Sequence, residues 1–118
     1  MIDDRRRFTR IPFDAHTTLN QDDWHIVVQL VDLSLRGLLI QQPDNWEPAR
    51  ARSPFTATID LSEGNQICME VHLAHAEEGL LGFQCLHIDL DSISHLKRLL
   101  SLNLGDADLL ERELGALL

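Results

Sequence analysis

The stretch FTATIDLSEGNQICMEVHLAH, residues 55–75, decides the fold class of this chain. Apolar and polar side chains alternate on both sides of the turn sequence Ser62–Asn65. A period of two is typical of half-buried strands, and Gly and Asn favour a turn between them. The stretch therefore predicts an antiparallel hairpin with one face directed at a core.

The same alternation continues on both sides of this hairpin. Further strands are expected over four ranges: Pro12–Leu19, Trp24–Val31, Gly37–Gln41 and Leu80–Ile88. Turn residues separate them, and the proline-rich segment Pro43–Pro54 is typical of a loop. With the hairpin, this makes six short strands.

A helical period replaces the period of two near the C-terminus. Leucines recur at helical spacing over Ser92–Leu104, with Ser92 or Asp91 as the expected N-cap and Gly105 after the last turn. A second helix is expected over Ala107–Leu117. The fold class predicted is mainly β: a small six-stranded antiparallel barrel with C-terminal helices.

Length and composition indicate a single domain. The chain has 118 residues, of which 44% are hydrophobic and 25% charged, as is usual for a globular fold. We expect one domain over residues 1–118, with a polar arm at 1–10, a barrel at 11–90 and helices at 91–118.

The charge is distributed unevenly along the chain. The net charge is −9, yet the first ten residues contain four arginines and only two acidic residues. An acidic body repels nucleic acid polymers and anionic membranes, so neither is an expected partner. An arginine cluster on such a body is better suited to a small anion, because each guanidinium offers a planar fork of donors.

The chain offers no signal for export or membrane insertion. No apolar run approaches the length of a membrane span, and no hydrophobic region follows the basic N-terminus. Two cysteines, Cys68 and Cys85, do not make a disulfide scaffold. We therefore expect a reduced, cytoplasmic setting.

Two short motifs stand out: RRRFTR at residues 5–10 and DLSLRG at residues 32–37. The first could be a solvated basic tail or an anion clamp. The second lies between two predicted strands and is typical of a turn, because Asp and Ser side chains bind nearby amides and Gly relieves backbone strain. The same turn also presents a carboxylate, a hydroxyl and a guanidinium within a few residues.

Together the two motifs resemble those of the PilZ family of bacterial cyclic di-GMP receptors. Arg6 and Arg10 match the family's RxxxR motif, and DLSLRG matches its (D/N)xSxxG motif. The segment GLLGF at residues 79–83 is similar to a late strand of the family. The resemblance covers nearly the whole chain and is closest to stand-alone PilZ proteins.

The resemblance implies a receptor that binds cyclic di-GMP and relays the signal to an unidentified downstream protein. Guanine presents paired acceptors to an arginine fork, phosphates accept charge-assisted bonds, and the guanine N–H groups need an acceptor such as a carboxylate. His75 stands where family members often have a bulky or aromatic residue beside the ligand. The implied ligand-binding residues are Arg5, Arg6, Arg7, Arg10, Asp32, Ser34, Arg36, Gly37 and His75.

Other functions have weaker support in the sequence. The alternative is a PilZ-like protein–protein interaction module that binds no nucleotide. No CxxC or HExxH spacing is present, and His72 and His75 are predicted to point to opposite faces of a strand, so no metal or cofactor is expected. No nucleophile and base stand in a catalytic order, so we expect a non-enzymatic, monomeric protein.

Overall fold

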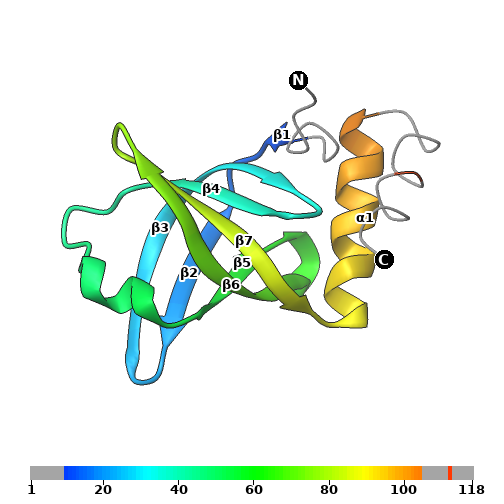
Figure 1. Cartoon of the computed structure of the whole chain (residues 1–118). Coiled ribbons are helices and arrows are strands. Elements are labelled where there is room, and N and C mark those ends of the chain that lie inside the picture. Colours follow the sequence, from blue (N-terminus) through cyan, green and yellow to red (C-terminus); the bar gives the residue numbers. More distant parts are fainter. Residues whose placement is uncertain (1–9, 105–111, 113–118) are drawn as a thin grey trace.

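The computed structural model describes residues 10–104 and Arg112. Within them the chain forms seven strands and one α-helix, together with two short 3-10 helices (Figure 1). The strands are β1 (Ile11–Pro12), β2 (His16–Gln21), β3 (Trp24–Ser34), β4 (Gly37–Gln41), β5 (Phe55–Asp60), β6 (Gln66–Glu77) and β7 (Leu80–Ile88). The helices are η2 (Pro48–Arg52), η3 (Ser62–Gly64) and α1 (Leu90–Leu104).

Six strands close into an antiparallel barrel. Their order is β3-β2-β5-β6-β7-β4, and β4 pairs back with β3. The two-residue strand β1 adds to the C-terminal half of β3. The predicted six-stranded antiparallel barrel with a C-terminal helix is therefore confirmed, while the expected second helix, Ala107–Leu117, lies outside the described residues.

The hairpin at residues 55–75 forms β5 and β6, as predicted. Its register pairs Phe55 with Val71 and Ile59 with Ile67. All the alternating apolar side chains of the paired segments are at most 2% exposed: Phe55, Ala57, Ile59, Ile67, Met69 and Val71. The period of two thus supplies one wall of the core.

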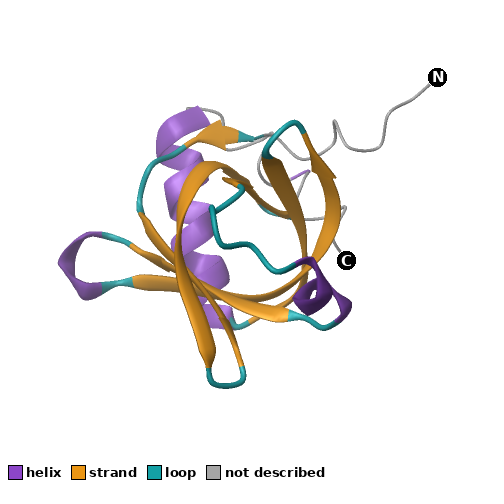
Figure 2. Cartoon of the chain, turned by 90° about the vertical axis from the view of Figure 1, so that its left-hand side faces the viewer, coloured by secondary structure: helices purple, strands orange, loops and turns teal. Residues whose placement is uncertain are grey.

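The two ends of the barrel are closed differently. At one end lies α1, which contributes the fully buried side chains of Leu96 and Leu100 to the core. In Figure 2 the loop that follows β4 crosses the near end of the barrel, with α1 behind it. Trp46 in this loop lies with its ring centroid 5.7 Å from that of Phe55 and 6.4 Å from that of Phe83.

Helix α1 begins two residues earlier than predicted, at Leu90. Its first turn is capped by Asp89, whose carboxylate accepts the Ser92 N–H at 3.0 Å, so the expected cap at Ser92 or Asp91 was wrong. Hydrogen bonds from Ser92 lower the pKa of Asp89. The Ser92 hydroxyl instead accepts the Cys68 N–H at 2.9 Å and so links α1 to β6. No helix in the part of the chain described here is long and apolar enough to span a membrane.

The predicted first strand, Pro12–Leu19, is divided in the structure. Its start belongs to β1 and its end to β2, and these pair with different halves of β3. Pro12 has no N–H group to donate, which favours a break in the ladder at this point. The break sends β1 along the end of β3 that carries the second motif.

Candidate functional site

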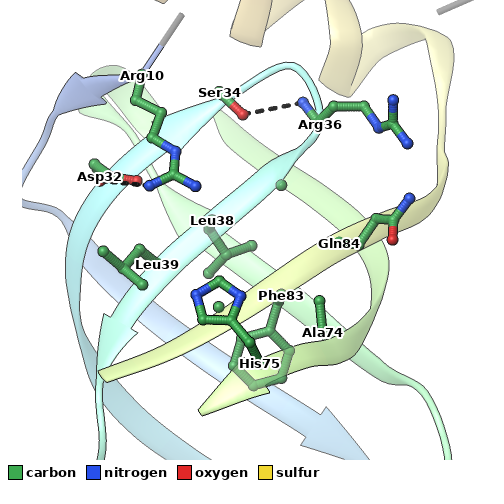
Figure 3. Close-up of a pocket in the computed structure, with 12 residues that line it drawn as sticks. Arg10, Asp32, Ser34, Arg36, Leu38, Leu39, Ala74, His75, Phe83 and Gln84 are labelled. Carbon is green, nitrogen blue, oxygen red and sulfur yellow. Dashed lines mark hydrogen bonds and ion pairs between the residues drawn. The ribbon is translucent and has the colours of Figure 1, made fainter. Parts of the chain in front are cut away.

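An open pocket lies on the side of the barrel formed by β6, β7, β4 and the end of β3 (Figure 3). Six predicted site residues meet there, and three others, Arg5, Arg6 and Arg7, lie outside the described residues. The lining consists of Arg10, Asp32, Ser34, Arg36, Gly37, Leu38, Leu39, Ala74, His75, Gly82, Phe83 and Gln84.

Arg10 and Asp32 face each other at one side of the pocket. The pairing of Pro12 with Asp32 brings the residues just before β1 to this part of β3. The Arg10 Nη1 and Asp32 Oδ2 atoms lie 3.9 Å apart, with the Arg10 side chain 50% exposed and that of Asp32 19% exposed. Burial raises the pKa of the Asp32 carboxyl, and the Arg10 charge opposes this shift. The pair is therefore loose, and both groups keep hydrogen-bonding capacity.

The DLSLRG motif forms the hairpin turn between β3 and β4. Ser34 pairs with Gly37, and the Ser34 hydroxyl accepts the Arg36 N–H at 3.1 Å. The buried side chain of Leu35 anchors the turn in the core, while Arg36 is exposed at the pocket rim. The motif can therefore act both as a turn and as part of a binding site, because the turn itself places Arg36 at the pocket rim.

Gly37 lets two strands approach closely. A Cβ atom at this position would meet the backbone carbonyl of Phe83 on β7. The neighbouring Cys85 N–H donates to the Arg36 carbonyl at 2.6 Å, which ties the turn to the same strand. Any side chain at Gly37 would therefore push β4 and β7 apart beneath the pocket.

His75 enters the pocket because of a β-bulge. The register of β6 against β7 shifts between Leu73, which faces Phe83, and His75, which faces Gly82. The extra residue turns His75 to the face that carries His72 and Gln84, so the prediction that the two histidines point to opposite faces was wrong. The His75 ring lies over Gly82, where a Cβ atom would collide with it.

Several lining residues were missed in the sequence. Gln84 lies two positions beyond Gly82 on β7, so the alternation of that strand places it on the same face. Its side-chain oxygen lies 3.4 Å from Nε2 of His72. Leu39 and Ala74 add apolar surface to the lining. The period of β7 was the signal for Gln84, whereas nothing in the sequence marked the bulge.

The site combines two guanidiniums, a carboxylate and a hydroxyl with a partly apolar surface. This set suits an anion with flat, hydrogen-bonding rings. Within residues 10–104 and Arg112, no group of three or more His, Cys, Asp or Glu side chains could hold a metal ion. Burial raises the pKa of the nearby Cys85 thiol, opposite to the shift that activates a nucleophile.

The fold and the pocket define a small antiparallel barrel module with charged and polar side chains gathered at an open pocket. The PilZ domain family model matches residues 4–102. The chain therefore belongs to the PilZ domain family, a family of cyclic di-GMP-binding modules.

Solved structures of low sequence identity share the fold. The Bacillus subtilis inhibitor of motility, MotI/DgrA, superposes with a TM-score of 0.67 at 15% identity, over 88% of this chain and 53% of that protein. The chain thus spans about half the length of that neighbour. The PilZ domain of CeSA from a cellulose-synthesizing bacterium gives 0.58 at 18% identity, over 80% of this chain and 98% of that domain. An uncharacterized Legionella protein gives 0.58 at 11% identity, over 82% and 95% of the two chains.

Proposed function

We propose that this chain is a receptor that binds cyclic di-GMP in the pocket between Arg10, Asp32 and His75. The observation that carries the proposal is the meeting of the two motifs: Arg10 from the RxxxR motif lies 3.9 Å from Asp32 of the DLSLRG motif. The two are 22 residues apart in sequence, and the β1–β3 pairing brings them together.

The chemistry of the ligand matches these groups. The O6 and N7 atoms of guanine accept both arms of an arginine fork, which Arg10 or Arg36 supplies. The N1–H and N2–H₂ groups of guanine donate to the Asp32 carboxylate. The two phosphodiesters accept charge-assisted bonds from the remaining guanidiniums, for which Arg5, Arg6 and Arg7 are the candidates.

Signal relay is proposed to follow from the arginine arm. Residues 1–10 carry four arginines, which repel one another until an anion neutralises them. Ligand binding would draw this segment onto the barrel and change the surface that an unidentified downstream protein reads in the cytoplasm. Slower amide exchange over residues 1–10 with cyclic di-GMP supports this relay, whereas equal exchange with and without ligand contradicts it.

The alternative, an interaction module without a nucleotide, has less support. Such a module has no need for Arg10, Asp32, Ser34 and Arg36 around one open pocket. No catalytic step on the nucleotide is proposed, and we expect the protein to act as a monomer.

Calorimetric titration with two cyclic dinucleotides tests the proposal. Cyclic di-GMP is expected to bind at least about tenfold more tightly than cyclic di-AMP, because adenine offers a donor where guanine offers O6. The recovered ligand should be intact by chromatography. Absence of heat with cyclic di-GMP, or equal affinity for both dinucleotides, would contradict guanine recognition and favour the interaction module.

A further inference from the structure

We propose that His75 makes ligand affinity depend on pH, so that the pocket binds cyclic di-GMP more tightly when the His75 imidazole is protonated. The inference rests on the proposed function and adds a regulatory input to the same site. It concerns a residue that the bulge in β6 places in the same pocket lining as Arg10 and Arg36, where an added charge acts directly on an anionic ligand.

The position of His75 is set by the backbone. The bulge between Leu73 and His75 turns the imidazole toward the pocket, and the ring occupies the space that Gly82 leaves empty. Leu39 pairs with Gly82 and therefore lies on the same face as the ring, and Figure 3 shows His75 across the pocket from Arg10 and Asp32. A ligand bound between these groups would lie against the ring.

The other charged groups around His75 are few. Arg10 and Arg36 line the pocket and stay charged at all relevant pH values. Burial raises the pKa of Asp32, but its protonation would remove an acceptor for guanine and weaken binding, which is opposite in sign to the effect proposed for His75. On β6 itself, His72 shares the face of His75, and Glu77 follows two positions later. The lining residues that β4 and β7 contribute are all non-titratable.

Among the described residues that line the pocket, His75 is the only histidine. Histidine is the side-chain type whose charge changes near neutral pH. The phosphodiesters and guanines of the ligand do not titrate between pH 6 and 8. A protonated imidazole adds one positive charge beside a ligand with two negative charges. Affinity should thus rise as the pH falls, and binding should draw a proton from the solvent, because the coupling is reciprocal.

Calorimetry at pH 6 and pH 8 at constant ionic strength tests the proposal. Wild-type protein is expected to bind cyclic di-GMP roughly three- to tenfold more tightly at pH 6, since a partly exposed charge is screened. His75→Gln keeps a polar side chain without a titrating group and should reduce this ratio to about one. At pH 7, buffers of different ionisation enthalpy should reveal proton uptake by wild type and none by the variant.

His25→Gln is the matched control. His25 is also an exposed histidine, but it lies seven residues before Asp32 on β3, about 23 Å along the strand. Its replacement should leave the wild-type pH ratio unchanged. A His72→Gln variant separates the two histidines on the same face of β6 and should keep most of the pH ratio.

The outcomes separate the two proposals. If wild type fails to bind cyclic di-GMP at either pH, the proposed function is wrong. If wild type binds but His75→Gln keeps the same pH ratio, or His72→Gln abolishes it, the inference about His75 is wrong while the receptor function stands.

Discussion

Two arginines near opposite ends of strand β3 are held in very different ways. Near the start of the strand, the Arg50 guanidinium lies 4.5 Å from the centroid of the Trp24 ring, and its Nε donates to Glu47 at 3.0 Å. Near the end of the strand, Arg10 lies 3.9 Å from Asp32, beyond hydrogen-bond distance, and half of its side chain is exposed.

The difference shows how one barrel uses the same residue type for two purposes. Arg50 stacks, forms an ion pair and lies within a network in which Gln21 also donates to the Arg50 carbonyl at 2.8 Å. Its Nε and Nη1 atoms donate to Glu47 and Gln21 and so help to fix the loop after β4. Arg10 faces an open pocket and, among the described residues, keeps its planar fork available for a ligand.

The largest effect is expected for Gly37→Ala, which disturbs the packing of β4 against β7 beneath the pocket. The new methyl group would collide with the Phe83 carbonyl, and overpacking of this kind costs roughly 1–3 kcal/mol. Thermal and urea unfolding should show a destabilisation of about 2 kcal/mol together with weaker ligand binding. Gly64→Ala is the control for alanine at a glycine with positive φ but without a steric clash, because φ is +78° there and a Cβ atom meets nothing within 4 Å. A fully stable Gly37→Ala protein would show that the close approach of β4 and β7 is not required.

Arg10→Ala should separate binding from stability. Loss of a bidentate contact is expected to weaken cyclic di-GMP binding by about tenfold or more, and Arg10→Lys should recover only part of this loss. The melting temperature without ligand should hardly change, because an exposed ion pair contributes little. Arg52→Ala, at an exposed arginine outside the pocket lining, is the matched control and should bind like wild type. Equal weakening in both variants would point to a non-specific effect of net charge.

Arg50→Ala should show the opposite pattern. Loss of the contact with Trp24 and of the Glu47 ion pair should lower the free energy of unfolding by about 1 kcal/mol. Affinity for cyclic di-GMP should stay within about twofold of wild type, since 1.4 kcal/mol is needed for a tenfold change. A large loss of affinity would contradict the separation of the two ends of β3.

The smallest effect on stability is expected for Asp32→Asn. Because burial raises the pKa of Asp32 above its ordinary value, the charged carboxylate is a cost to the folded state at neutral pH. Any stabilisation by this group is present in acid and is lost as the pH rises through the raised pKa. The variant should therefore melt at the same or a slightly higher temperature at pH 7, while guanine binding weakens. A clear drop in melting temperature would show that Asp32 mainly stabilises the turn.

Much of this arrangement could be predicted from local sequence patterns. Alternation predicted the walls of the barrel. The two motifs predicted five of the residues that line the pocket, and the family resemblance added His75. The pattern failed where one backbone detail decides the outcome. The bulge before His75 turns this side chain to the opposite face of β6, and the break after Pro12 separates β1 from β2. Asp89 caps helix α1 because its carboxylate reaches the Ser92 N–H. The bulge and the break depend on strand register, which a single period does not encode. The cap depends on which of several neighbouring polar side chains reaches a free N–H group at the start of the helix.

The most direct test of the central claim is an NMR titration that follows backbone amides as cyclic di-GMP is added. The largest shifts are expected on residues 32–37, 74–75 and 82–84 around the pocket, whereas residues 20–24 and 46–52 at the other end of β3 should barely move. Shifts centred on the Arg50 end, or none at saturating ligand, would contradict the assignment of this pocket as the binding site.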